Sequence, residues 1–383
     1  MKALFTTFPG YGHLLPMLPL ARAAAAAGDE VVIAGSKELH ALAEGLPVHA
    51  LGPSYPDLVA ENERRLAHDA PAPESRTDGP DSSAVFDVLV AMFTTTRADM
   101  AFDELRALAV DERPDIIVAE MWDFVAPLVA QRLEIPWVSF THSAATPIDA
   151  ALEAGLTRAL QQRALTMPPR LANVQLWPEW LESDQGAAVP HEASIAIRTV
   201  PHDTPAEVDI PAFDGERPAV LVTLGTVVAD PALLNAAVRG VLDAGADALV
   251  TTGFGTSPGD VEGPADRVRV VPFAPIAQLL DRVQAVVATG GSGTTLAALS
   301  RRLPVGFVPR MANQPLNAAA VADFGAGIVC AEDPASLTSA VQRLLHEPGL
   351  RARASAAAEL LGRRPAPATV WSALRDRIGA SRT

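Results

Sequence analysis

Residues 285–300 read AVVATGGSGTTLAALS, a short apolar run followed by a glycine-rich turn and a second apolar stretch. The run at 285–288 predicts a buried strand, and residues 293–300 predict the helix after it. Glycines let the backbone approach an anion, and the first turn of a helix offers free N–H groups at its positive end. The turn is therefore a candidate phosphate site, with an ordinary strand-to-helix connection as the alternative. Its members are Thr289, Gly291, Ser292, Gly293 and Thr294.

Other glycine-rich motifs do not fit the chain. A P-loop requires Gly-Lys followed by Ser or Thr, which does not occur after this turn, and a nucleophile elbow would need glycine where Thr294 stands. The turn GYGH at 10–13 begins like a dinucleotide fingerprint, but Leu15 occupies the third glycine position. The strand at 31–34 is also not followed by the acidic residue that holds a nicotinamide ribose. These two mismatches exclude a nicotinamide-dependent dehydrogenase.

Apolar strands and helices alternate through most of the chain. Strands are expected at 3–7, 31–34, 116–119, 137–141, 220–224, 248–252, 268–271, 285–288 and 305–308, and helices at 14–27, 84–109, 124–132, 231–244, 276–280, 293–300, 315–324 and within 335–377. This alternation predicts the α/β class, with parallel sheets covered by helices on both faces. Two doubly wound, Rossmann-like domains facing each other across a cleft are the expected architecture.

Prolines and acidic residues cluster at 201–218 and predict the connection between the two domains. We expect an N-terminal domain at 1–205, a linker at 206–218, a C-terminal domain at 219–365, and a last helix at 366–383 that packs back toward the N-terminal domain. Residues 54–83 hold four prolines among many charges and predict a mobile loop or lid. Residues 166–190 show no clear periodicity.

Composition limits the partners of the protein. The chain has 383 residues, 49% of them hydrophobic, and a formal net charge of −15. The apolar content argues against disorder, and the acidity argues against nucleic acid or an anionic membrane as partner. The single cysteine, Cys330, excludes an internal disulfide and is expected to be a small buried residue. The apolar N-terminal run is too short for a signal peptide, and no apolar stretch reaches the roughly 18 residues of a membrane span. We therefore expect a cytoplasmic protein.

His13 is the candidate general base, because it follows the first strand at its carboxyl end and an imidazole titrates near neutral pH. The alternative is a histidine that only fills the start of a helix. Such a base needs an acidic partner on its other nitrogen. Glu120 follows the strand at 116–119 at the same edge, whereas Asp115 precedes that strand and Asp123 lies further on. Glu120 is the expected partner, with an acidic residue at a helix start as the alternative.

Other polar residues are expected in the same crevice. Gly225 and Thr226 follow the strand at 220–224, and the amides of Asn313 and Gln314 precede a helix, where they could hold sugar hydroxyls or simply cap the helix. No metal is expected, since Asp-x-Asp is absent and His191-Glu192 has no second histidine four residues from the first.

Together these motifs resemble those of nucleotide-sugar-dependent glycosyltransferases of family 1, which have the GT-B fold. The likeness is strongest to bacterial enzymes that glycosylate polyketide, macrolide, enediyne-type and other secondary metabolites. It covers nearly the whole chain and is carried by TTFP and GH within 6–13, PDIIVAE at 114–120, VTLGT at 222–226, VPFAP at 271–275, TGGSGT at 289–294 and PRMANQ at 309–314.

The resemblance implies an inverting, metal-independent transfer of a sugar from a dTDP- or UDP-sugar in the C-terminal domain to an apolar acceptor in the N-terminal domain. His13 matches the base that deprotonates the acceptor, and Glu120 matches its partner. The implied donor-binding residues are Gly12, Gly225 and Thr226, together with Phe273 and Pro275 at the nucleobase, Thr289 and Gly291 to Thr294 at the diphosphate, and Asn313 and Gln314 at the sugar.

Two positions depart from the family pattern. The family commonly has histidine where Thr289 stands, so stabilisation of the leaving group rests more on backbone amides here. It commonly has aspartate where Asn313 stands, which suggests an altered or deoxygenated donor sugar. Two other functions stay open at this point: a nucleotide-sugar epimerase or hydrolase on the same fold, and a non-catalytic partner of a glycosyltransferase. The sugar, the acceptor, the linkage and the oligomeric state stay open as well, with a homodimer as one alternative.

Overall fold

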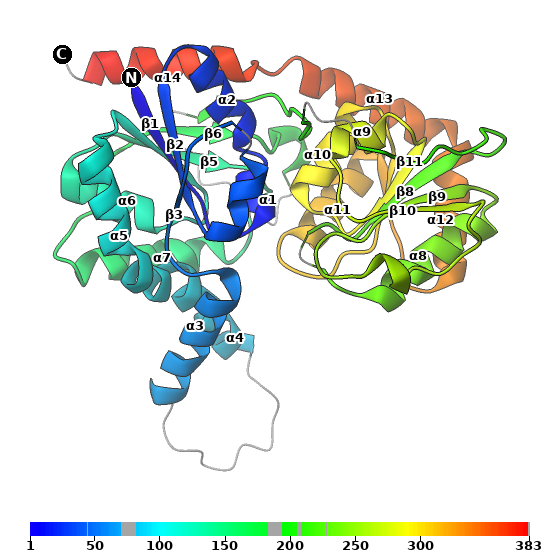
Figure 1. Cartoon of the computed structure of the whole chain (residues 1–383), viewed down its shortest axis with the longest axis horizontal. Coiled ribbons are helices and arrows are strands. Elements are labelled where there is room, and N and C mark those ends of the chain that lie inside the picture. Colours follow the sequence, from blue (N-terminus) through cyan, green and yellow to red (C-terminus); the bar gives the residue numbers. More distant parts are fainter. Residues whose placement is uncertain (44, 70–81, 183–193, 205–207, 227, 382–383) are drawn as a thin grey trace.

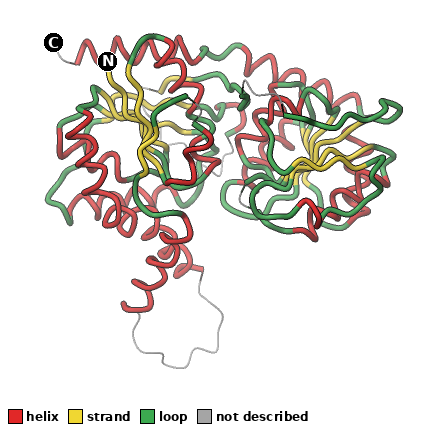
Figure 2. The backbone as a smooth tube through the Cα atoms, in the orientation of Figure 1, coloured by secondary structure: helices red, strands yellow, loops and turns green. Residues whose placement is uncertain are grey.

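Two parallel β-sheets, each flanked by helices, lie side by side in the computed structural model (Figure 1, Figure 2). The structure describes the chain apart from residues 44, 70–81, 183–193, 205–207, 227 and 382–383. The first sheet ends with residue 196 and the second begins with residue 219. The segment between them therefore crosses from one sheet to the other.

The first sheet has seven strands in the order β3-β2-β1-β4-β5-β6-β7. Its strands are β1 (Lys2–Thr6), β2 (Glu30–Gly35), β3 (Val48–Ala50), β4 (Ile116–Glu120), β5 (Trp137–Thr141), β6 (Arg170–Gln175) and β7 (Ser194–Ala196). The α-helices around it are α1 (Tyr11–Leu14), α2 (Leu18–Ala26), α3 (Tyr55–Asp69), α4 (Ser82–Ala91), α5 (Arg97–Glu112), α6 (Val125–Leu133) and α7 (Asp149–Gln161).

The second sheet has six strands in the order β10-β9-β8-β11-β12-β13. Its strands are β8 (Ala219–Thr223), β9 (Asp247–Thr251), β10 (Val268–Val271), β11 (Ala285–Ala288), β12 (Val305–Phe307) and β13 (Gly327–Val329). The helices that follow are α8 (Pro231–Asp243), α9 (Ile276–Leu280), α10 (Ser292–Ser300), α11 (Gln314–Phe324), α12 (Pro334–His346), α13 (Pro348–Gly362) and α14 (Pro367–Ser381).

Both sheets have the doubly wound order, in which the chain reverses direction across the sheet beside its first strand. The reversal lies between β1 and β4 in the first sheet and between β8 and β11 in the second. Ligands of such sheets bind in the crevice outside the carboxyl ends of the strands at this reversal. The α/β class and the two doubly wound sheets agree with the sequence prediction, and the loops after β1, β4, β8 and β11 are where a site is expected.

The expected loop at 54–83 is wrong in its first part, because residues 55–69 form α3. Pro56 lies in the first helical turn, where a missing N–H does no harm, and the Ser54 hydroxyl accepts a hydrogen bond from the Asp57 backbone N–H at 3.3 Å. Leu58 is fully buried and anchors the helix. The rest of the expected loop, from 70 to 81, lies outside the described residues.

Two expected helices are divided. Of the helix expected at 14–27, Leu14 is the end of α1 and residues 18–26 form α2, because Pro16 interrupts the hydrogen bonding and Pro19 falls in the first turn of α2. The helix expected at 84–109 contains a π-helical segment, Met92–Thr96, between α4 and α5. Strands β3, β6, β7 and β13 and helix α7 were not expected from the sequence.

Helix α14 returns from the C-terminal half and runs along α2, close to the N-terminus (Figure 1). The buried Trp371 indole donates a hydrogen bond to Asp29 Oδ2 at 2.7 Å, and Asp29 Oδ1 also accepts one from the N-terminal amine of Met1. Cys330 is buried, as expected, and burial raises the pKa of its thiol to about 11. None of the helices in the described part of the chain has the length and apolar character of a membrane span.

Candidate active site in the cleft

His13 is the third residue of α1, the short helix that follows β1. Its ring folds back over the backbone of Gly10, where a Cβ atom would lie only 2.8 Å from His13 Cδ2. Only glycine at position 10 leaves room for this ring position. The ring packs between the aromatic rings of Phe8 and Trp122 and is tilted relative to both, with centroid distances of 5.2 and 5.5 Å.

Glu120 is the last residue of β4 and is almost completely buried. Its Oε1 lies 3.1 Å from His13 Nδ1, a short contact that lacks hydrogen-bond geometry. Burial on its own would raise the pKa of the Glu120 carboxyl, but His13 and a second imidazole, His142, together lower the pKa to about 2. The group is therefore a buried carboxylate at neutral pH.

The two other acidic candidates lie elsewhere. Asp115 accepts a hydrogen bond from the Lys2 backbone N–H at the opposite end of the sheet. Asp123 is buried beside the guanidinium of Arg97, with 3.8 Å between Oδ1 and Nε, and burial raises the pKa of its carboxyl. Of the three acids that flank β4, the one beside His13 is Glu120.

His142 was not expected from the sequence. It follows β5 directly, is buried, and places its Nε2 2.9 Å from Glu120 Oε1 and its Nδ1 3.3 Å from Ser292 Oγ. Its ring also meets the His13 ring edge-on, with 5.4 Å between centroids. The signal that singled out His13, a histidine just after the carboxyl end of a central strand, applies equally to His142 and would have found it.

The glycine-rich turn leads from β11 into α10, as expected, although α10 begins one residue earlier at Ser292. Gly290 has a φ of +95°, and a Cβ atom there would lie 2.8 Å from the Gln314 carbonyl oxygen, so the turn requires glycine. Added Cβ atoms at Gly291 and Gly293 would meet nothing within 4 Å. The start of α10 thus faces open space with its N–H groups free for an anion.

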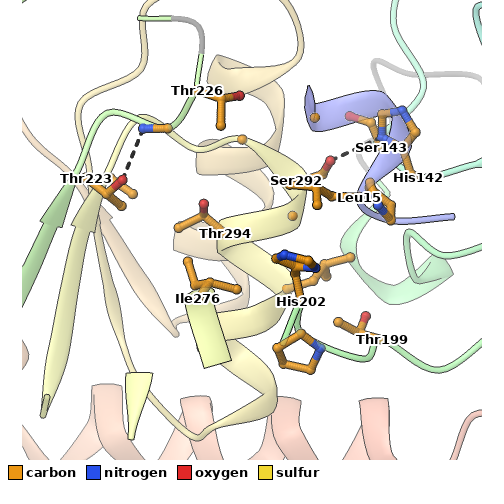
Figure 3. Close-up of a pocket in the computed structure, with 18 of the residues that line it drawn as sticks. Leu15, His142, Ser143, Thr199, His202, Thr223, Thr226, Ile276, Ser292 and Thr294 are labelled. Atoms are coloured by element: carbon orange, nitrogen blue, oxygen red, sulfur yellow. Dashed lines mark hydrogen bonds between the residues drawn. The ribbon is translucent and has the colours of Figure 1, made fainter. Parts of the chain in front are cut away.

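A cavity of about 270 Å³ lies between the two halves of the chain (Figure 3). The expected site residues that line it are Gly12, His13, Gly225, Thr226, Phe273, Thr289, Gly291, Ser292, Gly293, Thr294, Asn313 and Gln314. Two are not among the lining residues: Pro275, and Glu120, which is buried behind the two histidines. The crossing segment 197–202, including Thr199 and His202, forms a further wall that was not expected (Figure 3).

Aromatic rings lie on both sides of the cavity. On the side of the C-terminal half, Phe273 stacks on Phe254 and Phe254 stacks on Tyr11 of α1, with centroid distances of 4.9 and 4.2 Å. On the His13 side, Phe93 packs against both Phe8 and Trp122, at 4.5 and 5.2 Å. The second group gives the N-terminal half an aromatic surface beside the candidate base.

Asn313 and Gln314 make contacts within the protein. The Asn313 amide donates to the Ala144 carbonyl oxygen at 2.7 Å, a bond between the two halves. The Gln314 amide oxygen accepts from the backbone N–H groups of Arg310 and Met311. The Thr289 hydroxyl donates to the Leu224 carbonyl oxygen at 3.4 Å.

His13, Glu120 and His142 are also the residues whose chemistry could suit a metal ion. One ligand atom from each lies within 4.8 Å of the others. Two imidazoles and a carboxylate are ligands of the kind that zinc accepts. In this arrangement, however, His142 already uses both ring nitrogens, one toward Glu120 and one toward Ser292. A metal would have to displace these contacts.

Comparisons with known proteins agree over both halves. The family model described as erythromycin biosynthesis protein CIII-like, N-terminal domain, matches residues 22–225, and its C-terminal counterpart matches residues 240–376. An elloramycin glycosyltransferase from Streptomyces olivaceus is 33% identical, over 100% of this chain and 99% of its own. An L-demethylnoviosyl transferase from Streptomyces niveus is 29% identical over 98% of this chain and 97% of its own.

Solved structures share the fold. The glycosyltransferase SnogD from Streptomyces nogalater matches with a TM-score of 0.77 and 27% identity over 99% of both chains. A glycosyltransferase from Streptomyces sp. SF2575, complexed with thymidine diphosphate, matches with a TM-score of 0.80 and 24% identity over 98% of this chain and 99% of that one.

Proposed function

The chain belongs to the erythromycin biosynthesis protein CIII-like family and is a glycosyltransferase of antibiotic biosynthesis, and on that premise we propose the reaction it performs. It moves a sugar from a dTDP- or UDP-sugar to an apolar natural-product acceptor, without a metal and with inversion at the anomeric carbon. His13 is the general base. One observation carries this proposal: His13, backed by Glu120, lines the same cavity as the open start of α10.

The donor diphosphate lies against α10 in this proposal. The N–H groups of Ser292, Gly293 and Thr294 begin the helix and have no partner within it, and the positive end of the helix dipole favours an anion there. The space in front of Gly291 and Gly293 is open. Support also comes from the relative crystallised with thymidine diphosphate.

The acceptor lies on the His13 side. Trp122 lines the cavity, and Phe8 and Phe93 extend the aromatic surface behind it. Such a surface favours an apolar acceptor, because stacking on large rings adds to the area removed from water. The relative from Streptomyces olivaceus is named as an elloramycin glycosyltransferase, which agrees with a natural-product acceptor.

Chemistry follows from this placement. The acceptor atom forms a bond to the anomeric carbon while the bond from that carbon to the diphosphate oxygen breaks, and a single displacement of this kind inverts the configuration. His13 takes the acceptor proton, and the Glu120 carboxylate stabilises the imidazolium that forms. The amides of α10 meet the charge that develops on the leaving diphosphate.

The substitution His13→Ala tests the proposal. We expect the turnover number to fall by about 10²–10⁴-fold, the usual contribution of a positioned base, while the dissociation constant for dTDP measured by calorimetry stays unchanged. His40→Ala, which removes an exposed histidine of the same domain, is the matched control. Undiminished turnover in His13→Ala would overturn the assignment of the base.

Product analysis tests the reaction class. With donor and acceptor present, NMR of the glycoside should show the opposite anomeric configuration to the donor, and a chelator should leave the rate unchanged. With the donor alone, sugar released or isomerised as fast as it is transferred would instead favour a hydrolase or epimerase.

A further inference from the structure

His142 is the one described side chain that contacts both the Glu120 carboxylate and the donor turn. Its Nε2 lies 2.9 Å from Glu120 Oε1. Its Nδ1 lies 3.3 Å from the hydroxyl of Ser292, the first residue of α10 (Figure 3). Glu120 belongs to the first sheet and Ser292 to the second half of the chain. The ring therefore spans the boundary between the base and the donor site.

The loop that carries His142 is held against the C-terminal half at a second point. Two residues further on, the Ala144 carbonyl oxygen accepts the hydrogen bond from the Asn313 amide at 2.7 Å. Asn317 in turn donates to the Gly290 carbonyl oxygen and ties α11 to the glycine turn. The loop that carries His142 is thus held against the C-terminal half at two points, His142 and Ala144, whereas the hydroxyl of Ser292 is the contact made to the ring itself.

The protonation of Glu120 sets the direction of the hydrogen bonds. Because the pKa of its carboxyl is lowered to about 2, Glu120 is ionised and can only accept. His142 Nε2 must then carry a hydrogen and donate it. In the neutral ring, Nδ1 is left as an acceptor, and the Ser292 hydroxyl is the donor. The chain of hydrogen bonds runs from Ser292 through His142 to Glu120.

This chain bears on how Glu120 meets His13. Within the described part of the protein, Glu120 Oε2 has no hydrogen-bond partner, and His13 Nδ1 lies near Oε1 without being aligned to it. The His142 N–H is therefore the contact that fixes the rotation of the carboxylate. His142 therefore sets the direction of the remaining lone pairs of the Glu120 carboxylate. That direction determines how well the carboxylate holds the His13 ring.

We propose that His142 is a positioning residue that couples the donor turn to the catalytic pair. This inference rests on the proposed function of His13 and Glu120. When the two halves are closed, Ser292 holds the His142 ring, and the ring holds the Glu120 carboxylate against His13. When the halves separate, the bond to Ser292 is lost and the carboxylate is free to rotate. The base is then oriented only while the donor turn is in place.

A double-mutant cycle between His142→Phe and Ser292→Ala tests the coupling. Each single change should lower the turnover number by about tenfold, with the donor KM within about threefold of wild type, and the double variant should be no slower than His142→Phe. Two losses that multiply, or a change in donor KM alone, would overturn the proposal. Ser300→Ala, at the far end of α10, is the control for Ser→Ala exchange on this helix.

Two amide variants separate the two contacts of the ring. His142→Gln can place an amide N–H near the former Nε2 and keep the bond to Glu120, so it should recover part of the turnover and make Ser292→Ala silent. His142→Asn can keep only the contact with Ser292 and should be as slow as His142→Phe. If His142→Asn recovers turnover and His142→Gln does not, the contact with Glu120 is not the one that supports turnover, which would contradict the proposal.

Histidine NMR gives a readout that needs no activity. The imidazole ¹⁵N signals of His142, assigned by their loss in His142→Phe, should show the tautomer with hydrogen on Nε2. Ser292→Ala should shift the signals of His13, which Ser292 does not touch, and Ser300→Ala should not. The other tautomer, or unchanged His13 signals, would refute the proposed relay, that is, the chain of hydrogen bonds from Ser292 through His142 to Glu120. If wild-type protein transfers no sugar from any nucleotide sugar, the proposed function fails, and these spectra still decide whether the relay exists.

Discussion

At the scale of single residues, the site is governed by buried groups whose charge depends on their neighbours. Glu120 keeps its charge because two imidazoles offset its desolvation, whereas the pKa of Asp123 is raised by burial despite the guanidinium of Arg97 nearby. The two acids lie three positions apart in the sequence. The different surroundings of Glu120 and Asp123, and not their positions in the sequence, shift the pKa values of the two carboxyls in opposite directions.

Glu182 is a third acid with an unusual environment, and it gives a pH prediction. It accepts a hydrogen bond from the Ala145 N–H in the loop that carries His142, and burial raises its pKa to about 7. A carboxyl whose folded pKa is raised stabilises the fold fully below its unfolded pKa, and this stability is lost as the pH rises through about 7.

We therefore expect the unfolding free energy of wild type to fall between pH 5 and pH 8 by about 1–2 kcal/mol more than that of Glu182→Gln, after allowance for the solvent-exposed part of the side chain. Urea unfolding at the two pH values measures this difference. Glu216→Gln, which removes an exposed carboxylate from the segment between the two sheets, serves as control. Equal pH dependence in Glu182→Gln and wild type would contradict the prediction.

At the scale of elements, the turn between β11 and α10 needs glycine for two different reasons. One is the backbone conformation of the turn, and the other is open space at the cavity. Gly290 needs its positive φ and lies against the backbone of α11, whereas Gly293 borders the open cavity. One glycine serves the fold, and the other leaves room for the ligand.

The two glycines should respond differently to substitution. Gly290→Ala should lower the unfolding free energy by about 1–3 kcal/mol, because a side chain there is strained and contacts the Gln314 carbonyl oxygen. Gly293→Val should leave the unfolding midpoint nearly unchanged but weaken dTDP binding, since the new side chain enters the open space at the start of α10 where the diphosphate is proposed to bind. Denaturant unfolding and calorimetry measure the two effects. A Gly293→Val variant that binds dTDP as wild type does would exclude the diphosphate from this turn.

The sequence predicted the elements whose burial pattern is uniform and missed those that depend on distant partners. Strands such as β4 and β11 are buried at every residue, so their apolar runs are clear. β7 and β13 have three residues each with exposed positions, and only pairing with a neighbouring strand makes them strands. Helix α3 was missed because its single proline, Pro56, was counted with the prolines further along the chain, although it lies in the first helical turn. His142 was missed because the rule that selected His13 was not applied to β5.

At the scale of the whole molecule, the two halves are joined by the returning C-terminal chain and by contacts across the cleft. The chain after α13 crosses back to the first half, where the buried Arg364 guanidinium donates to the carbonyl oxygens of Gln175 and Leu176, and Leu176 also lines the cavity. Trp371 then fastens α14 to Asp29. At the cleft itself, the described contacts between the halves include those of the loop after β5 with Ser292 and Asn313. The first set ties the returning chain to the first half, and the second ties the two halves to each other at the cleft.

Asn313 offers the sharpest test of this arrangement. Its amide N–H donates to the Ala144 carbonyl oxygen, but aspartate has no N–H and would face that oxygen with a charge. We expect Asn313→Asp to favour the open cleft, with a larger radius of gyration by small-angle scattering and a donor KM raised about tenfold, because a buried hydrogen bond is replaced by repulsion.

The matched control is Asn235→Asp, which removes a similar amide bond, to the Asp260 carbonyl oxygen, inside the C-terminal half. It should leave both the radius and the donor KM as in wild type, because it touches neither the cleft nor the loop after β5. If Asn313→Asp keeps the wild-type radius and KM, the contact at Ala144 does not hold the halves together, and closure must rest on the segment at 197–202 that forms the other wall of the cavity.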